Sequence, residues 1–183
     1  MKFFNFDGMF LKLITEEANN IAEAARKNAS WSTRIPNAIS VGTAEIIGDG
    51  KYSIAVIVDA TPDKDWKNPN PNSAPEAVAF EYGSGIHGKK GQTYIIKPIN
   101  APVLAFDWPG HDPDSPMGKK FVGISDTTGK FLFNYVDHPG VAARPFLKPA
   151  IDANRKRIKS KLISVFKRGF LDSIKGQFRD FSA

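Results

Sequence analysis

A proline-punctuated stretch decides how this chain folds, and it reads His138-Pro139-Gly140-Val141-Ala142-Ala143-Arg144-Pro145-Phe146-Leu147-Lys148-Pro149-Ala150. Proline lacks a backbone N–H and fixes φ, so the residues from His138 to Phe146 cannot be helical. Pro149 is tolerated in a first helical turn, where its missing N–H would have had no partner. We therefore expect a helix to begin near Leu147 or Lys148, at an angle to a sheet that the stiff lead-in fixes.

Helical periodicity appears at both ends of the chain. Apolar residues recur every three to four positions from about Met9 to Asn28, with Asp7 placed to cap the first turn. A second amphipathic pattern runs from about Lys148 to Ile174. Each pattern predicts a helix with one face buried against the rest of the protein.

Between the two helices, runs of β-branched and aromatic residues separated by Gly and Pro predict strands. The expected strands are 39–47, 51–60, 77–82, 93–96, 103–106, 121–124 and 130–136. The order helix, strands, helix predicts an α+β fold, in which an antiparallel curved β-sheet packs against the N-terminal helix and the long C-terminal helix. Two long loops, Thr61–Pro75 and Ala105–Lys120, are expected to contact other chains.

Composition limits the chemistry of the chain. Its 183 residues fit one domain, and no Cys is present to form disulfides or thiolate sites. No apolar run approaches the roughly 20 residues of a membrane span, and Met1–Asp7 does not resemble a secretion signal. We expect a soluble protein made in the cytoplasm.

Positive charge is concentrated at the C-terminal end. Residues 144–183 hold eleven Lys and Arg against three Asp, which gives this end +8 and leaves −2 for the rest of the chain. The densest cluster consists of Arg155, Lys156, Arg157, Lys159 and Lys161. Such asymmetry indicates contact with DNA or an acidic partner, although a solvated helix face is the simpler alternative.

Candidate catalytic and metal sites are weak in this sequence. Gly83-Ser84-Gly85 lacks the Lys-Ser/Thr ending of a phosphate loop, and Ser84 with His87 and Glu81 lacks the Gly-x-Ser-x-Gly pattern. The three histidines, with Glu81, Asp112 and Asp114, show no metal-binding spacing. Aromatic side chains around Trp66, Trp108, Tyr94 and Phe106 are expected in a core or subunit contact rather than in a base-stacking platform. We expect no enzyme activity, cofactor or metal, and a structural ion pair between Glu81 and Arg144.

Three segments resemble one protein family. His138-Pro139-Gly140 through Arg144-Pro145-Phe146-Leu147 and Pro149-Ala150 resembles the "HPG-x-x-A-R-P-F-L-x-P-A" signature of head–tail joining proteins of tailed bacteriophages, which are also called tail-completion or neck proteins. Phe80–Gly85 resembles the family's "V-E-F/Y-G-T/S-G" segment, including Glu81, Gly83 and Gly85. Ala25–Ile39 resembles a third segment, with Thr33-Arg34 where the family has Thr-Gly.

The resemblance implies a non-enzymatic virion protein that joins head and tail as a ring subunit in the neck of a phage or prophage. It implies homo-oligomers and portal-side or tail partners. The basic helix would then contact DNA non-specifically or face an acidic partner, and no membrane contact is expected. The corresponding domain would span residues 1–168, followed by a basic-aromatic extension at 169–183. The alternative is a basic nucleic-acid-binding accessory protein for DNA packaging or nuclease function, docking through the 155–161 cluster.

Overall fold

The computed structural model describes residues 6–48, 50–65, 68–106 and 121–180, and the chain separates into two units. Unit 1 consists of Met1–Glu81 and Arg144–Ala183, and unit 2 consists of Tyr82–Ala143. Unit 2 is therefore an insertion in the chain of unit 1. This division differs from the predicted single domain over 1–168, and the predicted boundary at 168/169 falls inside a continuous helix.

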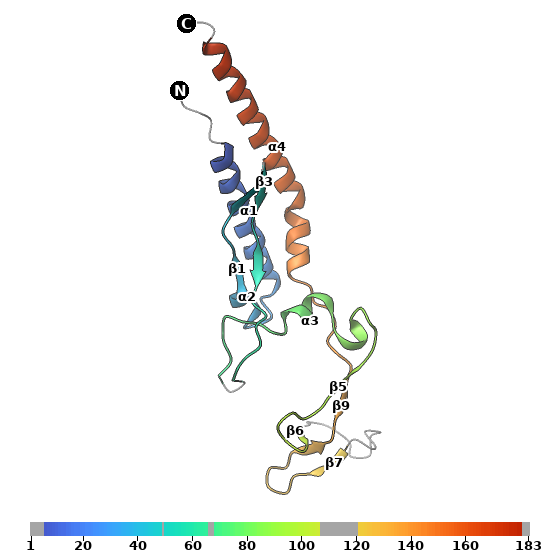
Figure 1. Ribbon diagram of the computed structural model, residues 1–183. Coiled ribbons are helices and arrows are strands. Elements are labelled where there is room, and N and C mark those ends of the chain that lie inside the picture. The colour runs from blue at the N-terminus through green and yellow to red at the C-terminus, as the bar shows by residue number, and fades with distance from the viewer. Residues whose placement is uncertain (1–5, 49, 66–67, 107–120, 181–183) are drawn as a thin grey trace. The chain divides into compact units, whose positions relative to one another are not determined.

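Two long helices run side by side in opposite directions in unit 1 (Figure 1). Helix α1 spans Phe6–Asn28, and helix α4 spans Leu147–Asp180. The start of α4 at Leu147 confirms the prediction from the proline pattern. Helix α1 begins earlier than expected, so Asp7 lies in its first turn, where its carboxylate accepts a 2.6 Å hydrogen bond from the Tyr52 hydroxyl.

Two small antiparallel sheets accompany α1. Strand β1 (Ile39–Val41) pairs with β4 (Val56–Val58), and β2 (Glu45–Gly48) pairs with β3 (Lys51–Ser53). The Gly42 N–H donates a 2.8 Å hydrogen bond to the Ala55 carbonyl between the two ladders. The predicted hairpin at Gly48–Gly50 is therefore confirmed, but each long predicted strand is broken into two short ones.

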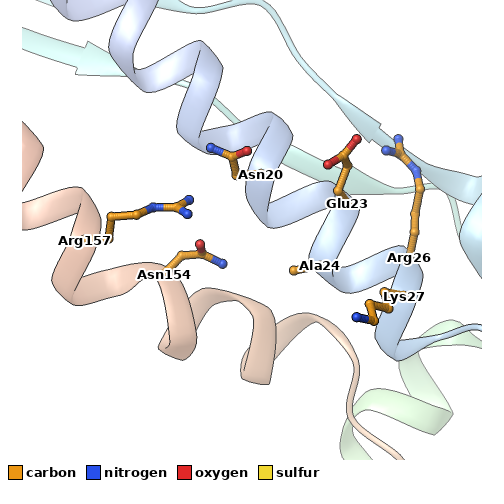
Figure 2. A pocket seen from close by; sticks show the side chains of 7 residues that line it. All are labelled: Asn20, Glu23, Ala24, Arg26, Lys27, Asn154 and Arg157. Atoms are coloured by element: carbon orange, nitrogen blue, oxygen red, sulfur yellow. The ribbon is translucent and has the colours of Figure 1, made fainter.

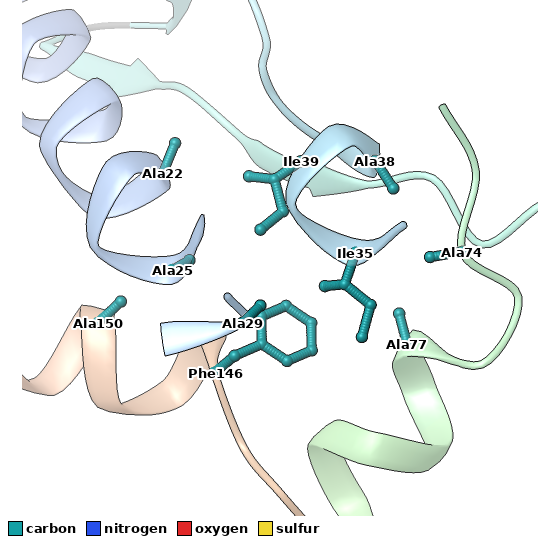
Figure 3. Close-up of a cluster of buried hydrophobic side chains, with 10 residues drawn as sticks. All are labelled: Ala22, Ala25, Ala29, Ile35, Ala38, Ile39, Ala74, Ala77, Phe146 and Ala150. Atoms are coloured by element: carbon teal, nitrogen blue, oxygen red, sulfur yellow. The ribbon is translucent and has the colours of Figure 1, made fainter. Parts of the chain in front are cut away.

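The core of unit 1 lies where α1, α2 (Ile35–Ala38) and the start of α4 meet (Figure 3). Small side chains from α1 and α4, including Ala25 and Ala150, allow the helices to approach closely. Phe146 is 1% exposed and fills the space beside Ile35. The buried residues of this cluster are Ala22, Ala25, Ala29, Ile35, Ala38, Ile39, Ala74, Ala77, Phe146 and Ala150.

The predicted strand at 77–82 is wrong, because these residues form helix α3 (Ala77–Tyr82). Ala77 and Glu81 are both buried and are spaced four residues apart, which places them on one face of a helix. In a strand the same spacing would also share a face, so periodicity alone did not separate the two structures. The high helix propensity of Ala77 and Ala79 favours the helix.

In its described residues, unit 2 contains short antiparallel strands and the 3₁₀ turn η1 (Gly85–His87). Strand β5 (Tyr94–Ile96) pairs with β9 (Val136–His138). The central strand β8 (Phe131–Phe133) pairs with β6 (Leu104–Phe106) and β7 (Phe121–Ile124). The α+β class with helices at both ends is thus confirmed, and within the described ranges the strands form four small sheets rather than one curved sheet.

Among the described residues, no helix is both long enough and apolar enough to cross a membrane.

Candidate functional site

The start of α4 is held by a carboxylate from a distant part of the chain. Glu81 is 9% exposed and accepts hydrogen bonds from three consecutive backbone N–H groups: Phe146 at 2.8 Å, Leu147 at 3.0 Å and Lys148 at 2.8 Å. The first N–H groups of a helix have no partner within the helix and carry partial positive charge. Glu81 therefore satisfies these donors and matches the helix dipole in one contact.

Arg144 does not form the predicted ion pair with Glu81. Its guanidinium lies 4.4 Å from the centre of the Trp31 ring, and its backbone N–H donates to the Phe80 carbonyl at 2.6 Å. Trp31 in turn packs edge-to-face on Phe80, with ring centres 4.8 Å apart. The Glu81 carboxylate is satisfied by backbone donors, so Arg144 is free to contribute a cation–π contact.

The remaining signature residues of this segment have structural positions. Pro149 is the third residue of α4, where its lack of an N–H leaves no vacant acceptor in the helix. Pro145 precedes the helix, and Phe146 fills the core while its carbonyl accepts a 3.0 Å hydrogen bond from the Asn28 side chain. The segment thus joins the end of α1 to the beginning of α4.

The glycines of the two signature segments meet in unit 2. Gly83, Gly85 and Gly140 have positive φ values of 74°, 59° and 94°. A side chain at Gly85 would overlap the Pro139 carbonyl, and one at Gly140 would overlap the Ser84 carbonyl. Only glycine permits both this backbone conformation and such a close approach of two chain segments.

Hydrogen bonds join the Gly83–Gly85 and His138–Val141 segments, which together we call the glycine clasp. Ser84 N–H donates to the Val141 carbonyl at 2.9 Å, and Val141 N–H donates to the Ser84 hydroxyl at 3.0 Å. Ile86 N–H donates to the Pro139 carbonyl at 2.7 Å. His138 accepts from Gly140 N–H at Nδ1 (2.9 Å), and its ring stacks on Tyr94. The predicted Gly83–Gly85 turn is confirmed, and its partner is the His138–Gly140 segment.

The basic cluster of α4 divides into two groups. Arg157 donates to Glu17 Oε2 at 2.8 Å, and Lys161 donates to Glu17 Oε1 at 2.6 Å and to Glu16 at 2.9 Å. The Glu17 side chain is only 3% exposed. Arg157 and Lys161 therefore hold α4 against α1 and are not free surface cations.

Opposing effects determine the pKa of Glu17. Burial of the carboxyl raises its pKa, but the hydrogen bonds and positive charges of Lys161 and Arg157 together outweigh burial, so the pKa is lowered. The hydrogen bond to Glu17 is the largest cause that raises the pKa of Lys161, followed by that to Glu16. Each group of this pair is thus held in its charged form.

The other cations of the cluster face solvent. Arg155, Lys156 and Lys159 are exposed, and none of the acidic side chains that the structure describes forms an ion pair with them. Lys148 is paired with Asp152. Only three of the five predicted contact residues therefore remain available for an external anion.

A groove of about 600 Å³ lies between α1 and α4 (Figure 2). Three of the six polar side chains that line it bond within the protein: Arg26 donates to the Ile39 carbonyl, Asn154 to the Ala150 carbonyl and Arg157 to Glu17. The lining residues are Asn20, Glu23, Ala24, Arg26, Lys27, Asn154 and Arg157. The groove does not bring together an acid, a base and a nucleophile.

A second cavity, of about 540 Å³, is apolar and lies near the beginning of α1. Aromatic rings form a continuous series beside it: Tyr52 stacks on Phe10, Phe10 on Phe6, and Phe6 contacts Phe166. Phe166 and Phe170 also stack and are 58% and 55% exposed. The stretch of α4 around Phe166 and Phe170 therefore presents a partly uncovered aromatic surface.

The residues considered for chemistry have other roles. The Ser84 hydroxyl accepts from Val141, the Glu81 carboxylate caps α4, and no described cluster of three or more His, Asp or Glu could hold a metal ion. His111, Asp112, Asp114, Trp66 and Trp108 lie outside the described residues, as does most of the Ala105–Lys120 loop.

Two important contacts could not be found from sequence patterns. Glu17 lies in an ordinary polar position of the α1 pattern, and its partner Arg157 is 140 residues away. Arg34 replaces the glycine of the resembled segment and bonds to Asp63 (2.9 Å), Asn70 (3.3 Å) and Ser73 (3.0 Å) in the Thr61–Pro75 loop. The arginine in place of the signature glycine was the one feature of the sequence that could have indicated this contact.

Comparisons of the chain with protein-family models, with curated proteins and with solved structures find no match.

Proposed function

We propose that this protein is a non-enzymatic structural component of a tailed-phage or prophage virion, where it joins head and tail as a ring subunit. Its role would be to fit surfaces together rather than to make or break bonds. The proposal combines the resemblance of the His138–Ala150 and Phe80–Gly85 segments with the distribution of apolar residues in unit 2.

The uncovered apolar side chains of unit 2 carry the proposal. Phe133 is the one buried apolar residue among those of unit 2 whose burial the structure describes. By contrast, Ile95, Ile99, Val122 and Ile124 are exposed by 56%, 93%, 51% and 51%. Exposed apolar residues in such number are typical of a surface that another chain covers. An assembly subunit needs such a surface, whereas an isolated globular protein does not.

The signature residues serve this role as positioning elements. Glu81 and the Pro145–Pro149 segment fix the first turn of α4, and the glycine clasp fixes the base of unit 2. Each contact is fully occupied within the chain. The signature would therefore preserve the local structure of each unit, rather than supply groups for a reaction.

Light scattering and negative-stain imaging of the purified protein test the proposal. We expect a closed oligomer, because a repeated heterologous contact around a ring covers the same apolar surface on every copy. The triple variant Ile95→Ser, Ile99→Ser, Ile124→Ser should shift the mass toward the monomer. The matched control is Ile46→Ser, Ile57→Ser, Val78→Ser, which removes exposed apolar residues from unit 1 instead.

A wild-type protein that remains monomeric at every concentration measured would contradict the ring. An equal loss of assembly in both triple variants would also contradict it, because the effect would then not be specific to unit 2.

A further inference from the structure

The outer side of α4 carries a row of cations that form no ion pair with the acidic side chains that the structure describes. At 3.6 residues per turn, Arg155, Lys156, Lys159 and Lys167 fall on one side of the helix. Asn154, Arg157 and Lys161 fall on the opposite side, which contacts α1. The four outer cations are all exposed, and no ion pair joins them to an acidic side chain that the structure describes.

We infer that this row binds the phosphate backbone of double-stranded DNA without reading its sequence. The row extends over about 18 Å of a straight helix at about 1.5 Å per residue. Duplex DNA carries one negative charge per roughly 1.7 Å of its axis, so several phosphates lie within reach of the row. Long, flexible Lys and Arg side chains suit such contacts, which position a protein but carry no sequence information.

Other anionic partners fit the three clustered cations Arg155, Lys156 and Lys159 less well. An anionic membrane requires apolar anchors among the cations, and no large apolar side chain is strongly exposed among Arg155, Lys156 and Lys159. Ile163 and Phe166 are exposed near Lys167, so the vesicle arm of the test below decides for that end of the row. Single-stranded nucleic acid requires aromatic rings for stacking, and no exposed ring lies among Arg155, Lys156 and Lys159. Phe166 and Phe170 are exposed near Lys167, so the single-strand arm of the test decides for that end of the row. The three clustered cations therefore favour a duplex, whose charge density is the higher.

The inference is independent of the head–tail assignment. A protein that forms rings but does not bind DNA would refute the inference and leave the proposed function in place. A monomer that binds DNA through α4 would do the opposite.

Fluorescence anisotropy with two duplexes of unrelated sequence, measured over a range of NaCl concentrations, is the test. We expect equal affinity for both duplexes and a slope of log K against log salt of about −3.6, at about −0.9 per phosphate contact. The variant Arg155→Gln, Lys156→Gln, Lys159→Gln should reduce the slope by about 2.7 and weaken binding by tenfold or more at low salt.

The matched control removes the same charge from unit 2, as Lys89→Gln, Lys90→Gln, Lys130→Gln. These lysines are not part of the α4 row, so the control should keep the wild-type slope. None of the substituted side chains has a hydrogen bond or ion pair among the described residues, so both variants should fold, as circular dichroism would verify.

Four results would overturn the inference. The first is equal weakening of DNA binding by the two variants, because the effect would then come from net charge alone. The second is DNA binding that does not depend on salt, and the third is tighter binding to the single-stranded form of the same sequence. The fourth is binding to polyglutamate or to phosphatidylglycerol vesicles that is as strong as binding to the duplex.

Discussion

Unit 1 and unit 2 are stabilised by different means. In unit 1, twelve of the thirteen buried apolar residues gather around α1, α2 and the start of α4, and the buried Glu17 is paired with two cations. In the described part of unit 2, where Phe133 is the one buried apolar residue, close backbone contacts at glycines and the hydrogen bonds between Ser84 and Val141 hold the chain together. The difference indicates that unit 1 has an apolar core of its own in addition to its exposed apolar residues, whereas the described apolar residues of unit 2 are mostly exposed and await cover by another chain.

The largest loss of stability is expected from a side chain added at Gly140, where neighbouring backbone atoms of unit 2 leave no space for it. Gly140→Ala would combine a strained positive φ with overlap of the Ser84 carbonyl, which should destabilise unit 2 by about 4 kcal/mol or more. Hydrogen exchange should show lost protection in peptides from residues 82–143 and retained protection in α1 and α4.

Gly129→Ala is the matched control for this prediction. Its φ of 64° is also positive, but nothing lies within 4 Å of the added methyl group. It should cost only about 1–2 kcal/mol. Loss of protection in both units on Gly140→Ala would show that the two units do not unfold separately, which would break the comparison.

Glu81→Gln tests the junction of unit 1. The amide would place an N–H group against backbone donors and remove the charge that matches the helix dipole, so we expect a loss of about 2–3 kcal/mol in the free energy of unfolding. Urea titration followed by circular dichroism measures it. Glu76→Gln, in the residue just before α3, should change stability by less than about 0.5 kcal/mol, and equal effects of the two substitutions would contradict the cap.

Glu17→Gln should lower the stability of unit 1 by about 1–2 kcal/mol near neutral pH, because Arg157 and Lys161 are partly exposed and screened by solvent. The folded-state pKa of Glu17 is below the ordinary 4.5. Its contribution is therefore fully present above pH 4.5 and declines as the pH falls through the lowered folded-state pKa. Thermal unfolding of the two proteins should converge at acidic pH, and a constant difference down to that range would contradict the ion-pair role.

The smallest effect is expected at Ile99, which is 93% exposed. Ile99→Ser should change the unfolding free energy of the monomer by less than about 0.5 kcal/mol, as differential scanning calorimetry at low protein concentration would measure. A clear destabilisation would mean that unit 2 buries Ile99 in its own structure, and the contrast with unit 1 would then be weaker.

Local rules predicted the parts of the fold that local chemistry controls. The prolines fixed the start of α4, and the Gly48–Gly50 segment fixed a hairpin, because each acts on its own backbone. Contacts between distant residues were not predictable. In the sequence, Glu17 occupies an ordinary polar position of its helix, and Arg157 and Lys161 resemble cations that face solvent. The expected Glu81–Arg144 pair was wrong because charge alone does not reveal that unpartnered N–H groups compete for the carboxylate.

The contact between Phe80 and Arg144 determines where the chain can tolerate a change of insertion. The Arg144 N–H lies 2.6 Å from the Phe80 carbonyl, so the insertion leaves and rejoins unit 1 at one point. Closing a long loop costs only slightly more entropy than closing a short one, so an insertion of almost any length is tolerated there. This junction can therefore accept the exchange of one inserted module for another, while the helical scaffold on either side keeps its own structure.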